Sequence, residues 1–156
     1  MTPAVKLLEK AGVAFSLVEY EHDPRSPAYG EEAAQALDLS PEEVFKTLLA
    51  RLDDGRLVMA MVPVSAQLDL KALARAAGGR KATLAETADA ERATGYVVGG
   101  ISPLGQRKRL PAFLDASAEH LASLHVSGGR RGLEISLAPN DLARLTGARC
   151  VPLARR

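Results

Sequence analysis

The chain has little of the chemistry on which many enzymes depend. Its 156 residues include one cysteine, Cys150, three histidines and no tryptophan. A single cysteine excludes a disulfide within the chain and fits a reducing cytoplasm. The histidines and the cysteine are scattered, so no spacing typical of metal ligands is present. We therefore expect no metal and no cofactor.

Long apolar segments are also missing. No run approaches the roughly 20 residues that a membrane-spanning helix needs, and Met1–Lys10 has no apolar core of signal-peptide length. Hydrophobic residues make up 47% of the chain and charged residues 25%, which is ordinary for a globular protein. We expect one domain over residues 1–156, cytoplasmic and without a membrane partner.

Charge is balanced overall but not along the chain. The net charge is +1, yet residues 1–78 contain 8 Lys/Arg and 12 Asp/Glu, whereas residues 79–156 contain 12 and 7. A basic half can form a local anion-binding face. The alternative is a scatter of solvated charges, and the sequence does not decide between them.

Helical and extended patterns follow one another without regular alternation of strand and crossover helix. Capping and periodicity predict helices over 3–11, 31–37, 70–77, 86–94 and 139–145, and a capping box at Ser40–Glu43 predicts another short helix. Strands are predicted over 15–20, 46–52, 56–62, 97–98, 124–127, 133–137 and 150–151. The pattern predicts an α+β fold with a mixed, largely antiparallel sheet.

A glycine-rich loop, Gly99-Gly100-Ile101-Ser102-Pro103-Leu104-Gly105, follows the predicted strand at 97–98. Paired glycines let another molecule approach the backbone closely, because no Cβ intervenes. Pro103 fixes its own φ and pushes Ser102 toward an extended conformation. We expect a stiff loop with free amides that can hold a carboxylate, a phosphate or an oxyanion. A binding loop is favoured over an ordinary turn by the nearby cations Arg107, Lys108 and Arg109.

Lys46 begins a predicted strand on which it shares a face with Leu48, Ala50 and Leu52. A lysine that leads an apolar row should point inward or into the mouth of a pocket, where its ammonium requires an anionic partner. The alternative is a lysine at a strand end that extends to water.

Two tyrosines, Tyr20 and Tyr29, bracket a predicted loop that contains His22 and Asp23. Their apolar rings and polar tips suit a small-molecule site, although such tyrosines also pack at rims. His22 is a candidate general base, but a lone loop histidine is more often solvated.

Ser127 ends a predicted strand at the Gly128–Gly129 turn, where its hydroxyl can serve a ligand or its own turn. Glu134 lies opposite the apolar face of its strand, so it is either solvated or paired with a cation such as Lys46 or a substrate amine. Cys150 has no activating neighbour except Arg149 and is interpreted as a small buried residue rather than a nucleophile.

Taken together, these segments resemble the YbaK/EbsC-type aminoacyl-tRNA deacylases, in particular the cysteinyl-tRNA(Pro) deacylase branch. The resemblance runs in order along nearly the whole chain. Its matching segments are Tyr20–Pro24, Phe45–Leu49, Gln67–Lys71, Thr94–Tyr96, Val98–Gly105, Val126–Gly129 and Arg131–Leu133. Members often have Phe where Tyr29 stands and Asp where Glu134 stands, changes that keep the chemical type but alter the size of the pocket.

The resemblance implies a single α+β domain with a barrel-like sheet around one pocket. It implies hydrolysis of the ester that joins cysteine to mischarged tRNA(Pro), with prolyl-tRNA synthetase as a candidate partner. The family's essential lysine falls on Lys46, and its substrate positions fall on Tyr20, Tyr29, Gly99, Ser127 and Glu134. Thr47, Ser102 and Pro103 are further expected substrate contacts.

The resemblance also implies a mechanism for a chain without a catalytic triad, a metal site or an activated cysteine. The thiol of the substrate cysteine would attack its own ester, and the amides of Gly99, Gly100 and Ile101 would stabilise the oxyanion. Lys46 would hold the terminal ribose or phosphate. The expected contacts to tRNA phosphates are Arg107, Lys108, Arg109, Arg130 and Arg131. Two alternatives stay open, namely a deacylase of different specificity and a non-catalytic module that binds aminoacyl-tRNA or the synthetase.

Overall fold

The computed structural model describes residues 1–26 and 29–156. Its helices are α1 (Pro3–Ala11), α2 (Tyr29–Ala36), α3 (Leu70–Ala76), α4 (Thr87–Thr94), α5 (Pro139–Thr146) and the short 3-10 helix η1 (Ala116–His120). Its strands are β1 (Phe15–Glu19), β2 (Phe45–Leu52), β3 (Leu57–Pro63), β4 (Gln67–Leu68), β5 (Ala82–Leu84), β6 (Ala112–Asp115), β7 (Leu124–Ser127), β8 (Leu133–Leu137), β9 (Arg149–Val151) and β10 (Ala154–Arg155). None of the helices in these ranges is long and apolar enough to cross a membrane.

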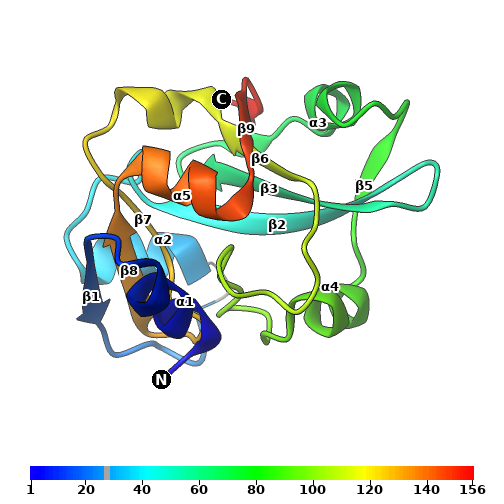
Figure 1. Cartoon of the computed structure of the whole chain (residues 1–156). Coiled ribbons are helices and arrows are strands. Elements are labelled where there is room, and N and C mark those ends of the chain that lie inside the picture. The colour runs from blue at the N-terminus through cyan, green and yellow to red at the C-terminus, as the bar shows by residue number, and fades with distance from the viewer. Residues whose placement is uncertain (27–28) are drawn as a thin grey trace.

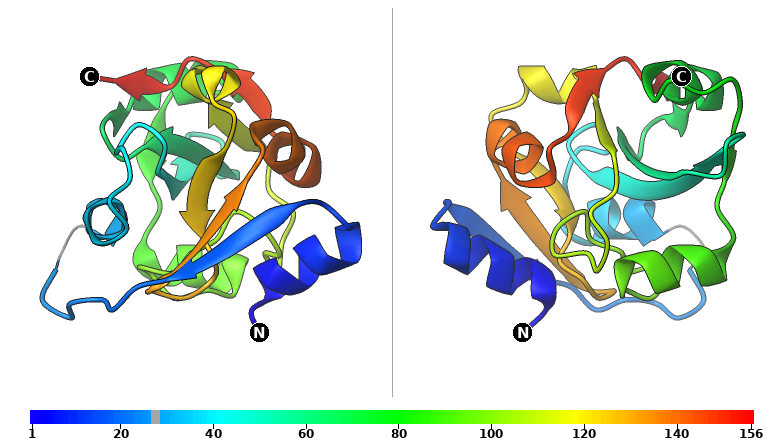
Figure 2. Two further views of the ribbon diagram at one scale, coloured as in Figure 1. Left: turned by 90° about the vertical axis from the view of Figure 1, so that its left-hand side faces the viewer. Right: turned by 45° about the vertical axis from the view of Figure 1, so that its right-hand side comes forward.

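The strands form a five-stranded sheet in the order β5-β2-β3-β6-β9, a three-stranded sheet β1-β8-β7 and a β4–β10 pair (Figure 1). The β3–β6 and β6–β9 pairings are parallel, as is the isolated bridge between Val44 and His125, and the other pairings in the described residues are antiparallel. The predicted α+β class with a mixed, largely antiparallel sheet is confirmed. The barrel-like closure implied by the resemblance is not seen, because the strands are divided among separate sheets. The two termini lie at opposite ends of the molecule (Figure 2).

The five-stranded sheet is covered on both faces. Met59 and Met61 of β3 belong to one hydrophobic cluster, and Val58, Ala60 and Val62 belong to another. A strand that is buried on both faces reads as a continuous apolar run, which is the pattern of Leu57–Pro63.

Helices α1 and α3 each begin at a residue whose side chain caps the first turn. The Thr2 hydroxyl accepts a hydrogen bond from the Val5 amide and donates one to the Gly128 carbonyl, so the cap of α1 also attaches this helix to the β7–β8 turn. The Asp69 carboxylate accepts hydrogen bonds from the Lys71 and Ala72 amides at the start of α3.

The helix predicted at Ser40–Glu43 is wrong. These residues form a turn, in which the amides of Glu42 and Glu43 donate to the side chain and the carbonyl of Ser40. Val44 is already extended, because it bridges His125 and its carbonyl accepts a hydrogen bond from the Val64 amide. Tertiary pairing therefore leaves no length for a helix.

The strand predicted at Val97–Val98 is also wrong. The Gly100 amide donates to the Val97 carbonyl, and the Val98 amide donates to the Glu91 carboxylate of α4. The segment therefore forms a turn, in which the preference of valine for strands is not used. Conversely, the sequence patterns missed β6, whose four residues are all buried and show no alternation.

Candidate active site

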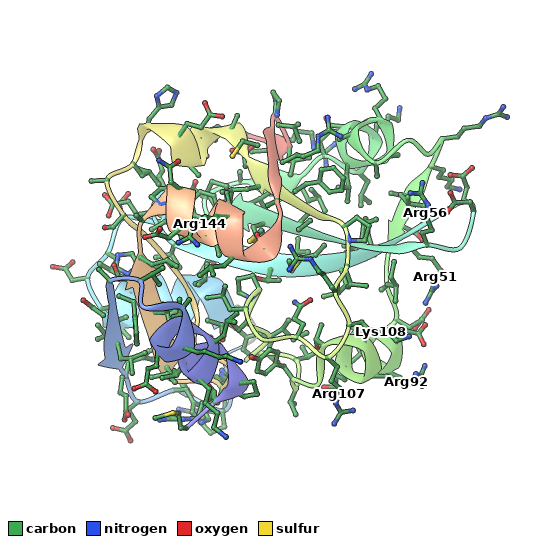
Figure 3. The ribbon with its side chains drawn as sticks, viewed as in Figure 1. Arg51, Arg56, Arg92, Arg107, Lys108 and Arg144 are labelled. Atoms are coloured by element: carbon green, nitrogen blue, oxygen red, sulfur yellow. The ribbon has the colours of Figure 1, made fainter. Side chains whose placement is uncertain are left out.

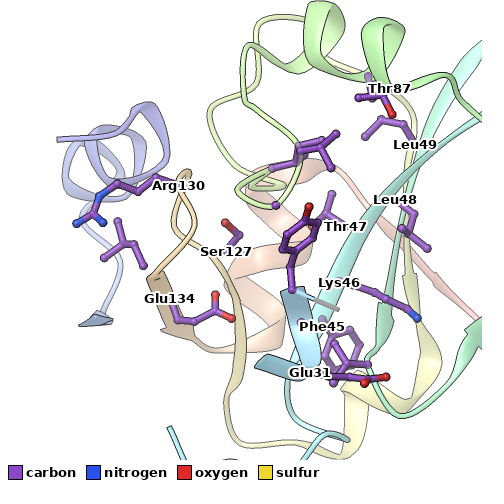
Figure 4. A pocket seen from close by; sticks show the side chains of 18 of the residues that line it. Glu31, Phe45, Lys46, Thr47, Leu48, Leu49, Thr87, Ser127, Arg130 and Glu134 are labelled. Carbon is purple, nitrogen blue, oxygen red and sulfur yellow. The ribbon is translucent and has the colours of Figure 1, made fainter. Parts of the chain in front are cut away.

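A cavity of about 490 Å³ opens between β2, α2, α4, the β7–β8 hairpin and the glycine loop (Figure 4). Nine of the predicted site residues line it, namely Tyr20, Tyr29, Lys46, Thr47, Gly99, Ile101, Ser127, Arg130 and Glu134. The fold thus brings together segments that are far apart in the sequence. No cysteine or histidine is among the lining residues in the described part of the chain.

The cavity follows the part of β2 that β5 leaves uncovered. β5 pairs only with Ala50–Leu52, and the Leu49 carbonyl accepts the last hydrogen bond from this side, from the Ala85 amide. Residues 45–49 therefore border the cavity. Because side chains alternate along a strand, Lys46 and Leu48 leave β2 on one face and Thr47 on the other (Figure 4).

Lys46 lines the cavity, which agrees with the first of the two alternatives for this residue. Its side chain is half-buried, and burial lowers the pKa of its ammonium, an effect that the charge of Glu31 partly opposes. Among the described residues Lys46 has no carboxylate within ion-pair distance. Its charge is therefore available to an anionic group of a ligand.

Glu134 is the most perturbed group in the cavity. It is only 5% exposed, which excludes the solvated alternative. Its Oε2 atom has no hydrogen-bond partner among the described residues, and burial raises its pKa to about 8. It does not pair with Lys46, which lies on the other side of the cavity (Figure 4). A buried acceptor without a partner is costly, which suggests that a ligand satisfies it.

Two hydroxyl groups also line the cavity, Ser127 beside Glu134 and Thr47 on β2. Ser127 lies directly opposite Glu134 in the β7–β8 ladder, so the two side chains are neighbours on one face. The Ser127 hydroxyl accepts a hydrogen bond from the Gly129 amide, which confirms its role in the turn. The Thr47 hydroxyl oxygen is buried without a partner in the part of the chain that the structure describes.

Both predicted tyrosines line the cavity. The Tyr29 ring stacks under the Arg131 guanidinium, 4.4 Å from the ring centroid. A Cβ on Gly99, where φ is 97°, would lie 3.2 Å from the Tyr29 ring. The pKa of Tyr20 is raised by burial and by the neighbouring charge of Glu134. Gly99 is thus needed both for its backbone conformation and for the approach of Tyr29.

The glycine loop differs in part from its prediction. The Gly100 amide is not free, because it donates to the Val97 carbonyl at 2.9 Å. A Cβ on Gly100 would lie 2.6 Å from Cα of Arg130, so the close approach is made by the chain itself. The amides of Gly99 and Ile101 donate to no group in the described ranges. These two amides are the remaining candidates for an oxyanion site.

Ser102 and Pro103 do not reach the cavity. Ser102 is fully buried, and its hydroxyl accepts a hydrogen bond from the Leu104 amide. Pro103 lines a second, smaller cavity of about 210 Å³ together with Lys108 and Arg109. The two residues shape the loop, and neither offers a side chain to the main cavity.

The five predicted phosphate contacts are not gathered around the cavity. Arg130 is at its rim, paired with the exposed Glu19. Arg131 is internal, because it pairs with Glu32 and donates to the carbonyls of Asp23 and Ser26.

The other three cations are exposed but lie elsewhere. Arg107 and Lys108 run beside the end of α4, where their amides donate to the Thr94 and Ala93 carbonyls. They lie on the same side of the molecule as Arg92 (Figure 3). Arg109 reaches toward the Leu145 carbonyl of α5.

Cys150 lies outside the cavity, on the edge strand β9. It is exposed, so the prediction of a buried residue is wrong, because β6 is the only strand beside it in the described sheet. Partial desolvation and the charges of Glu119 and Asp115 raise its pKa, which disfavours the reactive thiolate. No group of three His, Cys, Asp or Glu side chains in the described residues could hold a metal ion.

Comparison with known proteins identifies the protein family to which this chain belongs. Residues 24–145 match the family model of the aminoacyl-tRNA editing domain. The chain therefore belongs to the aminoacyl-tRNA editing family, and it is an enzyme of the aminoacyl-tRNA deacylase type.

Three similar proteins were found, and the names of two of them describe an activity. The chain is 34% identical over 145 residues to EbsC of Enterococcus faecalis, covering 93% of this chain and 88% of EbsC, a protein whose name proposes a Cys-tRNA(Pro)/Cys-tRNA(Cys) deacylase. It is also similar to a crystal structure of a proposed trans-editing enzyme for prolyl tRNA synthetase, with a TM-score of 0.85 and 27% identity, covering 100% of this chain and 99% of the other. A hypothetical protein, APE2540, shares the fold with a TM-score of 0.87 at 23% identity, covering 98% and 99% of the two chains.

Proposed function

We propose that this protein hydrolyses cysteinyl-tRNA(Pro) and that the thiol of the substrate performs the attack. The observation that carries the proposal is the composition of the cavity. Within the described residues it offers a buried carboxyl without a partner, a half-buried ammonium and two amides that donate to no group, but no cysteine or histidine that could act as an activated nucleophile or base. Such a site can orient an aminoacyl ester, and the attacking group must come from the substrate or from water.

The inner side of the cavity suits the amino acid. A protonated α-amine of the substrate would supply the partner that Glu134 Oε2 lacks, and the pair would form in a water-poor site. The incoming positive charge favours the carboxylate, so binding would draw the proton from Glu134. The Ser127 hydroxyl beside Glu134 and the Thr47 hydroxyl on β2 would contact the amino acid.

The chemistry then needs the substrate, the loop and one water molecule. The substrate sulfur forms a bond to its own ester carbonyl carbon, and the bond to the ribose oxygen breaks. The thiol proton goes to the departing ribose hydroxyl, and water opens the cyclic thioester to release cysteine. The Gly99 and Ile101 amides would stabilise the oxyanion on the way.

The experiment compares cysteinyl-tRNA(Pro) with seryl-tRNA(Pro) and alanyl-tRNA(Pro) as substrates. We expect rapid hydrolysis of the cysteinyl ester only, because an alcohol is a far weaker nucleophile than a thiol and alanine has neither. Cys150→Ser, which changes the chain's own thiol outside the cavity, is the matched control and should keep full activity. Equal rates for cysteinyl and seryl esters would rule out attack by the substrate thiol.

Lys46 provides the second test. Lys46→Ala should lower kcat/KM at least about 100-fold while the thermal midpoint stays near that of the wild type, because a charge contact to the nucleotide is lost. Lys46→Arg should also be poor, since a planar fork does not replace a compact ammonium. Turnover by the alanine variant near that of the wild type would remove Lys46 from the mechanism.

A further inference from the structure

Strand β1 forms an uncovered edge of the three-stranded sheet. It pairs with β8 on one side only, and it lies at the outside of the molecule (Figure 1). Its residues 16–19 are exposed, and they include two apolar side chains, Leu17 at 46% and Val18 at 38%. The strand contains neither lysine nor proline, the residues that commonly protect an edge from pairing with another strand.

The backbone groups of β1 alternate between the two sides of the strand. The Tyr20 amide donates to the Gly132 carbonyl of the neighbouring chain segment, so the even-numbered residues of this strand turn their backbone groups toward β8. The odd-numbered residues Phe15, Leu17 and Glu19 turn theirs outward. These outward amides and carbonyls bond to no other group in residues 1–26 and 29–156.

The outward groups are arranged symmetrically about Leu17. When two copies of β1 pair antiparallel with their Leu17 residues opposite each other, Phe15 of each copy lies opposite Glu19 of the other. Every outward residue then meets an outward residue, and each such pair exchanges two backbone hydrogen bonds. The two leucines contact each other, and Val18 lies opposite Ser16 of the second copy. Both exposed apolar side chains of the strand therefore gain contacts in this one register.

We infer that β1 is the contact surface for a second copy of this chain, and that the two three-stranded sheets join across a twofold axis at Leu17. In strand addition the main-chain hydrogen bonds provide affinity and the side chains select the partner. A twofold contact requires a surface that is complementary to itself, which this register provides. The inference does not depend on the proposed function.

The charges of β1 and α1 favour a second copy as the partner. The side chain of Glu19 stays 72% exposed although it pairs with Arg130. In the proposed register Glu19 lies at the Phe15 end of the other strand, which follows the last turn of α1 with its exposed Lys10. The two Glu19 side chains stand at opposite ends of the paired strands, so they do not repel each other closely.

Sedimentation equilibrium over a range of protein concentrations provides the first test. We expect a reversible equilibrium between monomer and dimer in the wild type. Leu17→Lys should raise the Kd of the dimer at least about tenfold, because it places two like charges opposite each other on the axis. The matched control is Val97→Lys, at a valine that is 73% exposed after α4, and it should keep the wild-type Kd. A wild type that is monomeric at every concentration would overturn the inference and leave the edge to an extended segment of another protein.

Cross-linking provides a second test, which depends on the register. Leu17→Cys and Val18→Cys are each made together with Cys150→Ser, so that each protein has one thiol. The Cα atoms of directly opposite residues in a hydrogen-bonded pair lie about 5.5 Å apart, within the range of a disulfide. Mild oxidation should therefore link the Leu17→Cys protein into a dimer much faster than the Val18→Cys protein, whose new thiol lies opposite Ser16. Equal rates for the two proteins would contradict a twofold axis at Leu17.

Discussion

Replacement of Glu134 by glutamine gives the most direct test of the electrostatics of the cavity. The ordinary pKa of this carboxyl is 4.5, and burial raises it to about 8 in the folded protein. Between these pH values the folded state keeps a proton that the unfolded state has lost. The contribution of this group to the free energy of unfolding is therefore complete below pH 4.5 and is lost as the pH rises through 8. Between these two pH values it falls by about 1.4 kcal/mol per pH unit.

Glutamine does not titrate, so Glu134→Gln should remove this loss. Relative to the wild type, the free energy of unfolding of the variant should rise by about 3.5 kcal/mol between about pH 5 and pH 8. The assay is urea unfolding at constant ionic strength across that range. Glu42→Gln, at an exposed glutamate in the turn before β2, is the control and should run parallel to the wild type. Parallel curves for Glu134→Gln and the wild type would refute the assignment of a buried, protonated carboxyl.

Three further predictions concern the loop and two arginines. Gly100→Ala should lower the free energy of unfolding by about 1–3 kcal/mol, because its Cβ would lie 2.6 Å from the Arg130 backbone. Urea unfolding measures this change, and an unchanged midpoint would contradict the close packing. Arg131→Ala should destabilise the fold by about 2 kcal/mol, since it removes a pair with Glu32 and two hydrogen bonds to carbonyls. Arg107→Ala should leave stability within about 0.5 kcal/mol of the wild type and lower the salt dependence of tRNA binding. A loss of stability in Arg107→Ala, or unchanged stability in Arg131→Ala, would contradict these two assignments.

Sequence patterns predicted an element correctly where the interactions that form it lie between residues close in sequence. The helices predicted over 3–11 and 70–77 begin at the caps Thr2 and Asp69, which act within one turn of helix. The strands predicted over 46–52 and 56–62 pair along their length across a short turn. The same local reasoning failed at Ser40–Glu43, where a good capping pattern is overruled by the pairing of Val44.

The sequence also indicated nine of the 21 residues that line the cavity. The alternation of β2 left Lys46 either at a pocket or extended to water, and the family resemblance grouped the two tyrosines and Ser127 in one substrate site. All four line the cavity. The state of Glu134 was not readable, because its strand position is equally consistent with solvent and with burial. Only the packing of the folded chain around β8 excludes water from the Glu134 carboxyl.

By itself, the sequence determined the class of fold, most of the element positions and the residue types available for chemistry. These depend on periodicity, caps and turn residues, which act over a few positions along the chain. Tertiary structure alone decided that Gly100 makes room for the chain rather than for a ligand, that Arg131 supports Tyr29, and that β5 stops short and leaves the edge of β2 open. Each of these depends on segments that are distant in sequence and meet only in the folded protein, where burial sets the charge of Glu134 and shapes the cavity.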